Sequence, residues 1–191
     1  MTELWEFRDM EIDSQLEKRC DELVSQYPKR RSAAMMVMHA IQEKFGYFDD
    51  SAVEFAARKL GVEPIEVYGM LSFYPMYSDT PRGRIHIKVC RTLSCALSGS
   101  VKLGQELAKI TGCRVGDTKG VYTLEFVECL GNCVRGPNVQ VNDKLFEAVA
   151  PEDAEKFMEK ISALDAAGEL APRSSFDNPQ GDGFDSPAYK G

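Results

Sequence analysis

Four cysteines, arranged as two separated pairs, constrain this chain more than any other feature. Cys90 and Cys95 lie in the segment CRTLSC, and Cys129 and Cys133 lie in CLGNC. Each pair ends an apolar run rich in β-forming residues, so both pairs are expected in short loops that follow strands. Four thiolates are a common ligand set for an iron–sulfur cluster or for a structural zinc ion. The sequence therefore predicts a metal centre and leaves the metal open.

The spacing within each pair favours a [2Fe–2S] cluster over zinc. Structural zinc sites usually contain tight C-x2-C pairs, although wider spacings occur. Here the pairs are C-x4-C and C-x3-C, with a long segment between Cys95 and Cys129. A plant-type ferredoxin also begins with C-x4-C, but it continues with a close C-x2-C pair that this chain lacks. Zinc, and after it a disulfide or inert thiols, are the alternatives.

Three segments of the chain resemble a known family. They are VYGMLSFYPMY at 67–77, PRGRIHIKVCRTLSCALSGS at 81–100 and GDTKGVYTLEFVECLGNCVRGPNVQVND at 116–143. These segments are similar to the thioredoxin-like [2Fe–2S] subunit of NADH dehydrogenases, the NuoE-type subunit of respiratory complex I. The family pattern, C-x4-C followed by C-L-G-x-C, is filled at every ligand position. The resemblance thus implies that Cys90, Cys95, Cys129 and Cys133 hold one [2Fe–2S] cluster.

The resemblance also implies an electron-transfer function inside a larger complex. The cluster is expected beside the flavin subunit of NADH:quinone oxidoreductase, with other peripheral-arm subunits nearby. The chain has no Walker A loop and no GxGxxG loop between a strand and a helix, so FMN and NADH are expected on a partner subunit. The same module occurs in soluble NAD-linked hydrogenases and formate dehydrogenases, which are one alternative. A stand-alone carrier ferredoxin and a zinc-binding interaction module are the others.

Composition argues against several function classes. The net charge of −7 is unfavourable for broad nucleic-acid binding. No stretch approaches the ~20 apolar residues of a membrane span, and the acidic N-terminus MTELWEFRDMEID lacks the apolar core of a secretory signal. We therefore expect a cytoplasmic protein without direct membrane insertion, peripheral to the inner membrane only through its partner subunits. In a reducing compartment, clustered thiols more often bind metal than form disulfides.

The expected fold class is α+β, in three parts. We expect an N-terminal helical bundle at 1–80, a thioredoxin-like [2Fe–2S] domain at 81–167 and an extended tail at 168–191. Apolar residues recur at helical spacing in the first part. In the second part the predicted order of elements is β–α–β–β–α, which suits a sheet with helices against it. The tail is rich in Pro, Gly, Ser and Asp and cannot build a core.

Local signals set the expected boundaries. Helices are predicted at 13–27, 32–45, 52–60 and 64–73, begun by Asp13 or Ser14, Ser32, the capping box Ser51-x-x-Glu54, and Pro64. Strands are predicted at 85–89, 122–128, 138–141 and 144–149, the last two forming a hairpin around Asn142-Asp143. Helices at 99–111 and 151–164 complete the pattern.

Several other residues receive structural interpretations. Cys20 shares the apolar stripe of the first helix and is expected to pack in a core, whereas Cys113 is expected to be partly exposed and chemically idle. His39 and His86 are interpreted as structural or surface residues, because four cysteines already complete the site. The basic run at 29–31 is expected in a solvated loop.

Two interpretations bear on tuning and docking. Arg91 and Arg135 flank ligands, and each either offsets the negative charge of a cluster or lies free in solvent. Backbone N–H groups near Gly131 are candidate donors to sulfur, and the alternative is that these loop residues only form the turns. The aromatic residues that follow the predicted bundle are candidates for a partner interface, although some are expected to pack inward: Tyr68, Phe73, Tyr74 and Tyr77.

Overall fold

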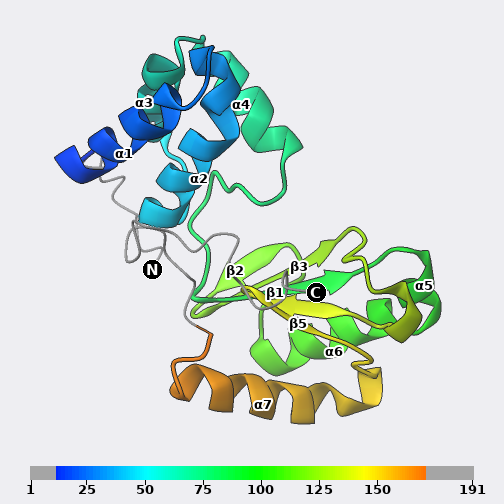
Figure 1. Ribbon diagram of the computed structural model, residues 1–191. Helices are drawn as coiled ribbons and strands as arrows, with labels where there is room; N and C mark the ends of the chain where they lie inside the picture. The colour runs from blue at the N-terminus through cyan, green and yellow to red at the C-terminus, as the bar shows by residue number, and fades with distance from the viewer. Residues whose placement is uncertain (1–11, 171–191) are drawn as a thin grey trace, which may run out of the picture. The chain divides into compact units, whose positions relative to one another are not determined.

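The computed structural model describes residues 12–170, and these form a fold of mixed helices and strands (Figure 1). The described residues fall into two compact units that divide between Pro81 and Arg82. One unit is helical and the other is built on a five-stranded sheet. Between residues 12 and 170, no helix combines the length and the apolar character that a membrane crossing requires.

The helical unit contains four α-helices around one apolar core. They are α1 (Ser14–Ser25), α2 (Ala34–Phe45), α3 (Asp50–Leu60) and α4 (Pro64–Phe73), with the short 3-10 helix η1 (Arg30–Ala33) before α2. The residues that α1 buries, Leu16, Cys20 and Leu23, follow its predicted apolar stripe, because i, i+3 and i+4 positions share one face. The core includes Leu16, Cys20, Met38, Ile41, Phe55 and Leu60. Cys20 is therefore a packing residue, as predicted.

Some predicted helix starts are confirmed and others are wrong. Asp13 caps α1 by accepting the Leu16 N–H, and Pro64 opens α4. The capping box at Ser51 is not used, because the carboxylate of Asp49 already accepts the Ala52 N–H. Ser32 is not an N-cap either, since it lies inside η1.

The basic run at 29–31 is exposed to solvent, as predicted, but its two arginines lie in a 3-10 helix rather than in a loop. Both belong to η1. The Arg30 guanidinium donates to the carbonyl of Lys59 at 2.9 Å, and Arg31 pairs with Glu66 at 2.6 Å. The arginines therefore tie η1 to α3 and α4.

The second unit is a five-stranded sheet in the order β2-β3-β1-β4-β5. Its strands are β1 (Ile85–Cys90), β2 (Asp117–Lys119), β3 (Tyr122–Val127), β4 (Val139–Val141) and β5 (Lys144–Phe146). β1 and β3 are parallel, and the other neighbouring pairs are antiparallel. The predicted β4–β5 hairpin is confirmed. The edge strand β2 was not predicted.

Helices cover one face of this sheet. α6 (Ser100–Thr111) and α7 (Ala154–Ala166) both lie on that face, and the 3-10 helix η3 (Pro151–Asp153) leads into α7 (Figure 1). Alternate residues of β1 enter the core with the apolar stripes of both helices, because strand side chains alternate between faces. This core includes Ile85, Ile87, Val89, Leu103, Leu107 and Ile161.

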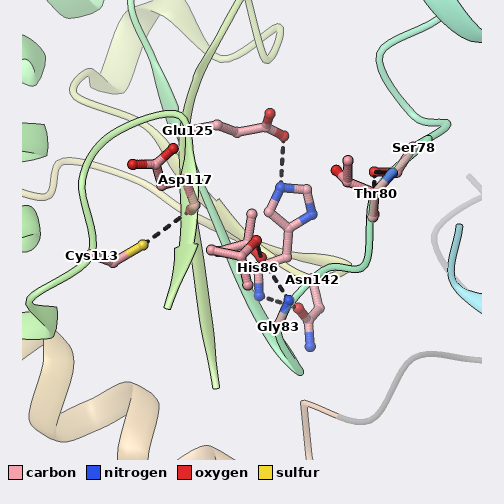
Figure 2. A network of polar contacts seen from close by, with 10 residues as sticks. Ser78, Thr80, Gly83, His86, Cys113, Asp117, Glu125 and Asn142 are labelled. Atoms are coloured by element: carbon pink, nitrogen blue, oxygen red, sulfur yellow. Dashed lines mark hydrogen bonds and ion pairs between the residues drawn. The ribbon is translucent and has the colours of Figure 1, made fainter. Parts of the chain in front are cut away.

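The other face of the sheet carries a polar network (Figure 2). His86 Nε2 lies 2.6 Å from Glu125 Oε1, and the His86 N–H donates to Asn142 Oδ1 at 2.8 Å. His86 is buried, which agrees with its structural interpretation.

The prediction for Cys113 is wrong in one respect: this residue is only 1% exposed, and its thiol donates to the Asp117 carbonyl at 3.0 Å.

Candidate metal centre

Strand topology brings the two cysteine pairs to one edge of the sheet. Cys90 is the last residue of β1, and Cys129 follows the end of β3. Because β1 and β3 are parallel neighbours, with Cys90 opposite Val127, their carboxyl ends open at the same edge. The chain between β1 and β3 passes through α6, a crossover of the kind that parallel neighbours require.

The second cysteine of each pair is positioned by a short helical turn. Cys95 lies on α5 (Leu93–Leu97), a five-residue helix that was not predicted, and Cys133 begins the 3-10 helix η2 (Cys133–Arg135). Gly136, directly after η2, approaches Cys95 closely. A Cβ at this glycine would lie 3.2 Å from Cys95 Sγ, so a larger residue would push the two loops apart. α5 and η2 therefore pack against each other at the edge of the sheet.

One pair of thiols has a spacing that suits a shared metal ion. The sulfur atoms of Cys129 and Cys133 are 3.5 Å apart. Two sulfurs bound at 2.3 Å to one tetrahedral metal would be about 3.8 Å apart, so this pair needs little movement to share an ion. Between residues 12 and 170, no three Cys, His, Asp or Glu side chains are grouped as ligands of one ion.

The thiols are also close enough to influence one another's ionisation. The hydrogen bond with Cys129 and the charge of Cys129 raise the pKa of Cys133, and burial and the charges of Cys95 and Cys90 add to this. This mutual repulsion is what a cation between the thiolates would relieve.

Burial divides the site into an inner and an outer side. Cys90 and Cys95 are 1% and 2% exposed, whereas Cys129 and Cys133 are exposed. Each predicted pair of ligands thus lies at its own depth, the first pair buried and the second pair at the surface of the sheet unit. The two remaining cysteines are not brought to the site, because Cys20 and Cys113 belong to the two separate apolar cores.

N–H groups from several loops point at the sulfur atoms. Burial acts to raise the pKa of the Cys90 thiol, but hydrogen bonds from the backbone of Thr92 and Leu130 and from the Cys95 thiol outweigh it, so the net pKa is lowered. The Gly131 N–H lies 3.4 Å from Cys129 Sγ. Such donors favour negative charge on sulfur.

Asn138 is a site residue that the sequence reasoning missed. Its side chain is buried, and its Nδ2 donates to Cys95 Sγ at 3.4 Å and to the Asn132 carbonyl at 2.6 Å. It precedes β4, and its own carbonyl accepts the Cys90 N–H at 3.0 Å. The antiparallel pairing of β4 with β1 therefore carries this amide to the thiols.

The flanking arginines are paired rather than free. Arg91 contacts Glu128 at 2.9 Å, and Arg135 contacts Glu147 at 3.0 Å. All four side chains are at least 46% exposed, so each pair is only weakly stabilising. The charge that either arginine offers the thiols is thus partly offset by its partner carboxylate.

Large aliphatic side chains on the two short helices that carry Cys95 and Cys133 are exposed to solvent. Leu93 and Leu97 on α5 are 72% and 80% exposed, and Val134 on η2 is 95% exposed. These residues, here called the aliphatic rim, flank Cys95 and Cys133 in sequence, on the two short helices α5 and η2 that pack against each other. Exposed apolar groups gathered at one place mark surfaces that another molecule covers.

Comparisons with known proteins show the family to which this chain is related. A sequence model of the family described as "Thioredoxin-like [2Fe-2S] ferredoxin" matches residues 20–162. NADH-quinone oxidoreductase subunit 2 of Thermus thermophilus is 38% identical over 128 residues, which are 65% of this chain and 71% of the relative. A second NADH-quinone oxidoreductase subunit, from Rhizobium meliloti, is 40% identical over 121 residues, 62% of this chain and 72% of the relative.

A solved structure shares the fold over a similar length. The similar chain belongs to an NAD⁺-reducing [NiFe]-hydrogenase in its air-oxidised state, and it is 19% identical with a TM-score of 0.56. The match covers 66% of this chain and 22% of the hydrogenase chain. At this identity the likeness concerns the fold.

Proposed function

Because the chain belongs to the thioredoxin-like [2Fe–2S] ferredoxin family, we propose that it is the electron-transfer subunit of an NADH:quinone oxidoreductase and carries one [2Fe–2S] cluster. The observation that supports this proposal most is that the parallel neighbours β1 and β3 end together, with Cys90 at the end of β1 and Cys129 just after β3, and that Cys133 Sγ lies 3.5 Å from Cys129 Sγ. Such a subunit belongs to an oxidoreductase complex but has no complete active site of its own.

The residues present fit such a cluster. The donor set consists of four thiols on two loops, which is the common ligand set of [2Fe–2S] centres. The 3.5 Å contact supports Cys129 and Cys133 as ligands of one iron, which leaves Cys90 and Cys95 for the other. When bound, the cluster supplies reversible one-electron transfer. The protein supplies thiolates, a dry inner side and N–H donors that favour the reduced, more negative state.

FMN and NADH are proposed to bind a partner subunit. The aliphatic rim of Leu93, Leu97 and Val134 supports this arrangement, because its apolar surface adjoins the exposed ligands. A partner seated on the rim would exclude water and bring its own redox group near the cluster. A stand-alone carrier has less use for a permanent apolar contact of this kind.

The helical unit is proposed to be a docking bundle for the same complex. The helix α4 supports this role, because three of its large apolar or aromatic residues are exposed to solvent: Ile65 is 73% exposed, Tyr68 40% and Phe73 75%. Of the four aromatic residues named from the sequence, Tyr77 is instead a core residue at 3% exposure. Phe73→Ser together with Ile65→Ser in the full chain should weaken co-purification with the flavin subunit and leave the visible spectrum unchanged.

We propose the same division of the chain into a helical bundle at 1–80, a thioredoxin-like [2Fe–2S] domain at 81–167 and a tail at 168–191. Residues 1–11 of the first part and 171–191 of the tail lie outside the described residues. We likewise propose a cytoplasmic protein held at the inner membrane through other peripheral-arm subunits, with no nucleic-acid partner. A soluble NAD-linked hydrogenase or formate dehydrogenase is the alternative parent, and the subunits that co-purify with the chain at high salt distinguish the two.

Anaerobic purification followed by iron, sulfide and zinc analysis tests the cluster. Two irons and two labile sulfides per chain are expected for a [2Fe–2S] centre. Cys→Ser at any of the four proposed ligands should abolish or strongly alter the visible and EPR spectra, whereas Cys113→Ser should leave them intact. Stoichiometric zinc without labile sulfide would instead establish the zinc-binding module.

A further inference from the structure

We propose that a groove between α6 and α7, here called the α6–α7 groove, is a second docking surface that receives a basic, amphipathic segment of a partner subunit. Two hollows of about 690 and 700 Å³ lie along the junction of these helices. Both are lined by Ile110 and Glu155, so they form one continuous groove. None of its lining residues is a proposed cluster ligand or a member of the aliphatic rim.

The shape of the groove follows from helix geometry. α6 lines it with residues four apart, Lys102, Glu106 and Ile110, which share one face of a helix. α7 lines it in the same way with Glu155 and Glu159. From residue 102 to residue 110 the helix rises about 12 Å, which is the length of roughly two turns of a docked helix.

The floor of the groove is apolar where the two hollows meet. Ile110 is 42% exposed there, and the buried Met158 and half-buried Tyr122 continue the floor toward the end of α6. An isoleucine left open in the middle of a groove suits an apolar anchor from another chain. This feature gives the proposed segment its apolar side.

The residues that line the α6–α7 groove carry an excess of negative charge. Lys102 pairs with Glu152 at 3.3 Å across one end, and Lys109 pairs with Glu106 at 2.9 Å. Glu155 and Glu159 are exposed and make no hydrogen bond or ion pair with any other residue of 12–170. The lining thus holds four carboxylates and two ammonium groups, which leaves a net charge of −2 beside the apolar floor: Glu106, Glu152, Glu155 and Glu159 against Lys102 and Lys109. A segment with Lys or Arg beside its apolar anchor is the complement of this pattern.

Photo-crosslinking in the purified complex tests whether the groove binds a partner. The docking proposal rests on the proposed function only in assuming that partner subunits are present. A photoreactive amino acid is placed at Ile110 of the full chain, and at Lys156, outside the groove, as control. The expected product joins position 110 to a peptide of another subunit that carries Lys or Arg within one helical turn of an apolar residue. Glu155→Lys with Glu159→Lys should remove this product.

A matched pair of neutral variants measures the charge contribution. Glu155→Gln with Glu159→Gln should weaken assembly about fivefold at low salt, because two exposed ion pairs are lost. Asp117→Asn with Asp143→Asn removes the same charge elsewhere on the sheet unit and should have no effect. A crosslink to a second copy of this chain, to a peptide without Lys or Arg, or to nothing would overturn the proposal, as would a crosslink that survives charge reversal. The cluster spectrum reports separately on the proposed function.

Discussion

Asn138→Leu should lower the midpoint potential of the proposed cluster. The Asn138 amide is the buried side-chain donor to a proposed ligand sulfur, at 3.4 Å from Cys95 Sγ. Reduction adds one negative charge to the cluster, so a donor to sulfur stabilises the reduced state more than the oxidised state. Leucine has a similar volume and no N–H, and it removes this difference.

The size of the effect follows from hydrogen-bond energies. A hydrogen bond to a charged group contributes roughly 1 kcal/mol more than one to a less charged group. For a one-electron couple, 59 mV corresponds to about 1.4 kcal/mol, so the expected decrease is about 40 mV. The variant should also lower the free energy of unfolding by about 1 kcal/mol, because the half-buried Asn132 carbonyl loses the donor that lies 2.6 Å away.

An EPR-monitored redox titration of the purified protein measures the shift. Gln140→Leu is the matched control, because Gln140 is half-buried on β4 and its side chain makes no hydrogen bond or ion pair within residues 12–170. Its potential should equal that of the wild type. If Asn138→Leu retains the EPR signal and its potential is also unchanged, the amide does not act on the cluster and the reasoning is refuted.

Three further changes probe other parts of the molecule. Arg135→Gln should lower the midpoint potential by less than Asn138→Leu does, because Glu147, at 3.0 Å from the arginine, already offsets its charge. Adding Glu147→Gln should restore the potential in the same redox titration. A higher potential in the single variant would contradict this. Cys20→Ser should lower the free energy of unfolding by about 1–3 kcal/mol in a urea titration, because a hydroxyl replaces a fully buried thiol. The visible spectrum of the cluster should persist in this variant, and its loss would show that Cys20 is a ligand. Burial holds the pKa of His86 below 6.5 despite the hydrogen bond to Glu125, so the unfolded chain takes up this proton first and stability should fall as pH drops below about 6.5. Burial acts to raise the pKa of Glu125, but the hydrogen bond from His86 outweighs it and lowers the net pKa, which adds a loss as pH falls through 4.5. His86→Gln should flatten the upper part of this pH dependence, and an unchanged slope would exclude His86 as its source.

The sequence was sufficient for the features that arise from local patterns. Alternation in β1 placed Ile85, Ile87 and Val89 on one face, and the helical stripe of α1 placed Cys20 in a core. It failed where a local signal was weak or had a competitor. β2 has three exposed residues and no apolar alternation, and α5 has only five residues. At α3, the signal at Ser51 was real but Asp49, two residues earlier, took the capping role.

The ligands and the groups that hydrogen-bond to them differ in predictability for a topological reason. Cys90 and Cys129 each follow a strand, and a β–α–β connection makes those strands parallel, so their thiols must meet at one edge. Asn138 reaches Cys95, 43 residues away, only because β4 adds antiparallel to the free side of β1. The spacing of residues in the sequence does not specify which strand β4 pairs with, because β4 would have the same sequence if it paired with a strand other than β1. Cysteine spacing therefore indicates where a cluster can bind, whereas the potential of that cluster depends on strand order and on amides that carry no motif.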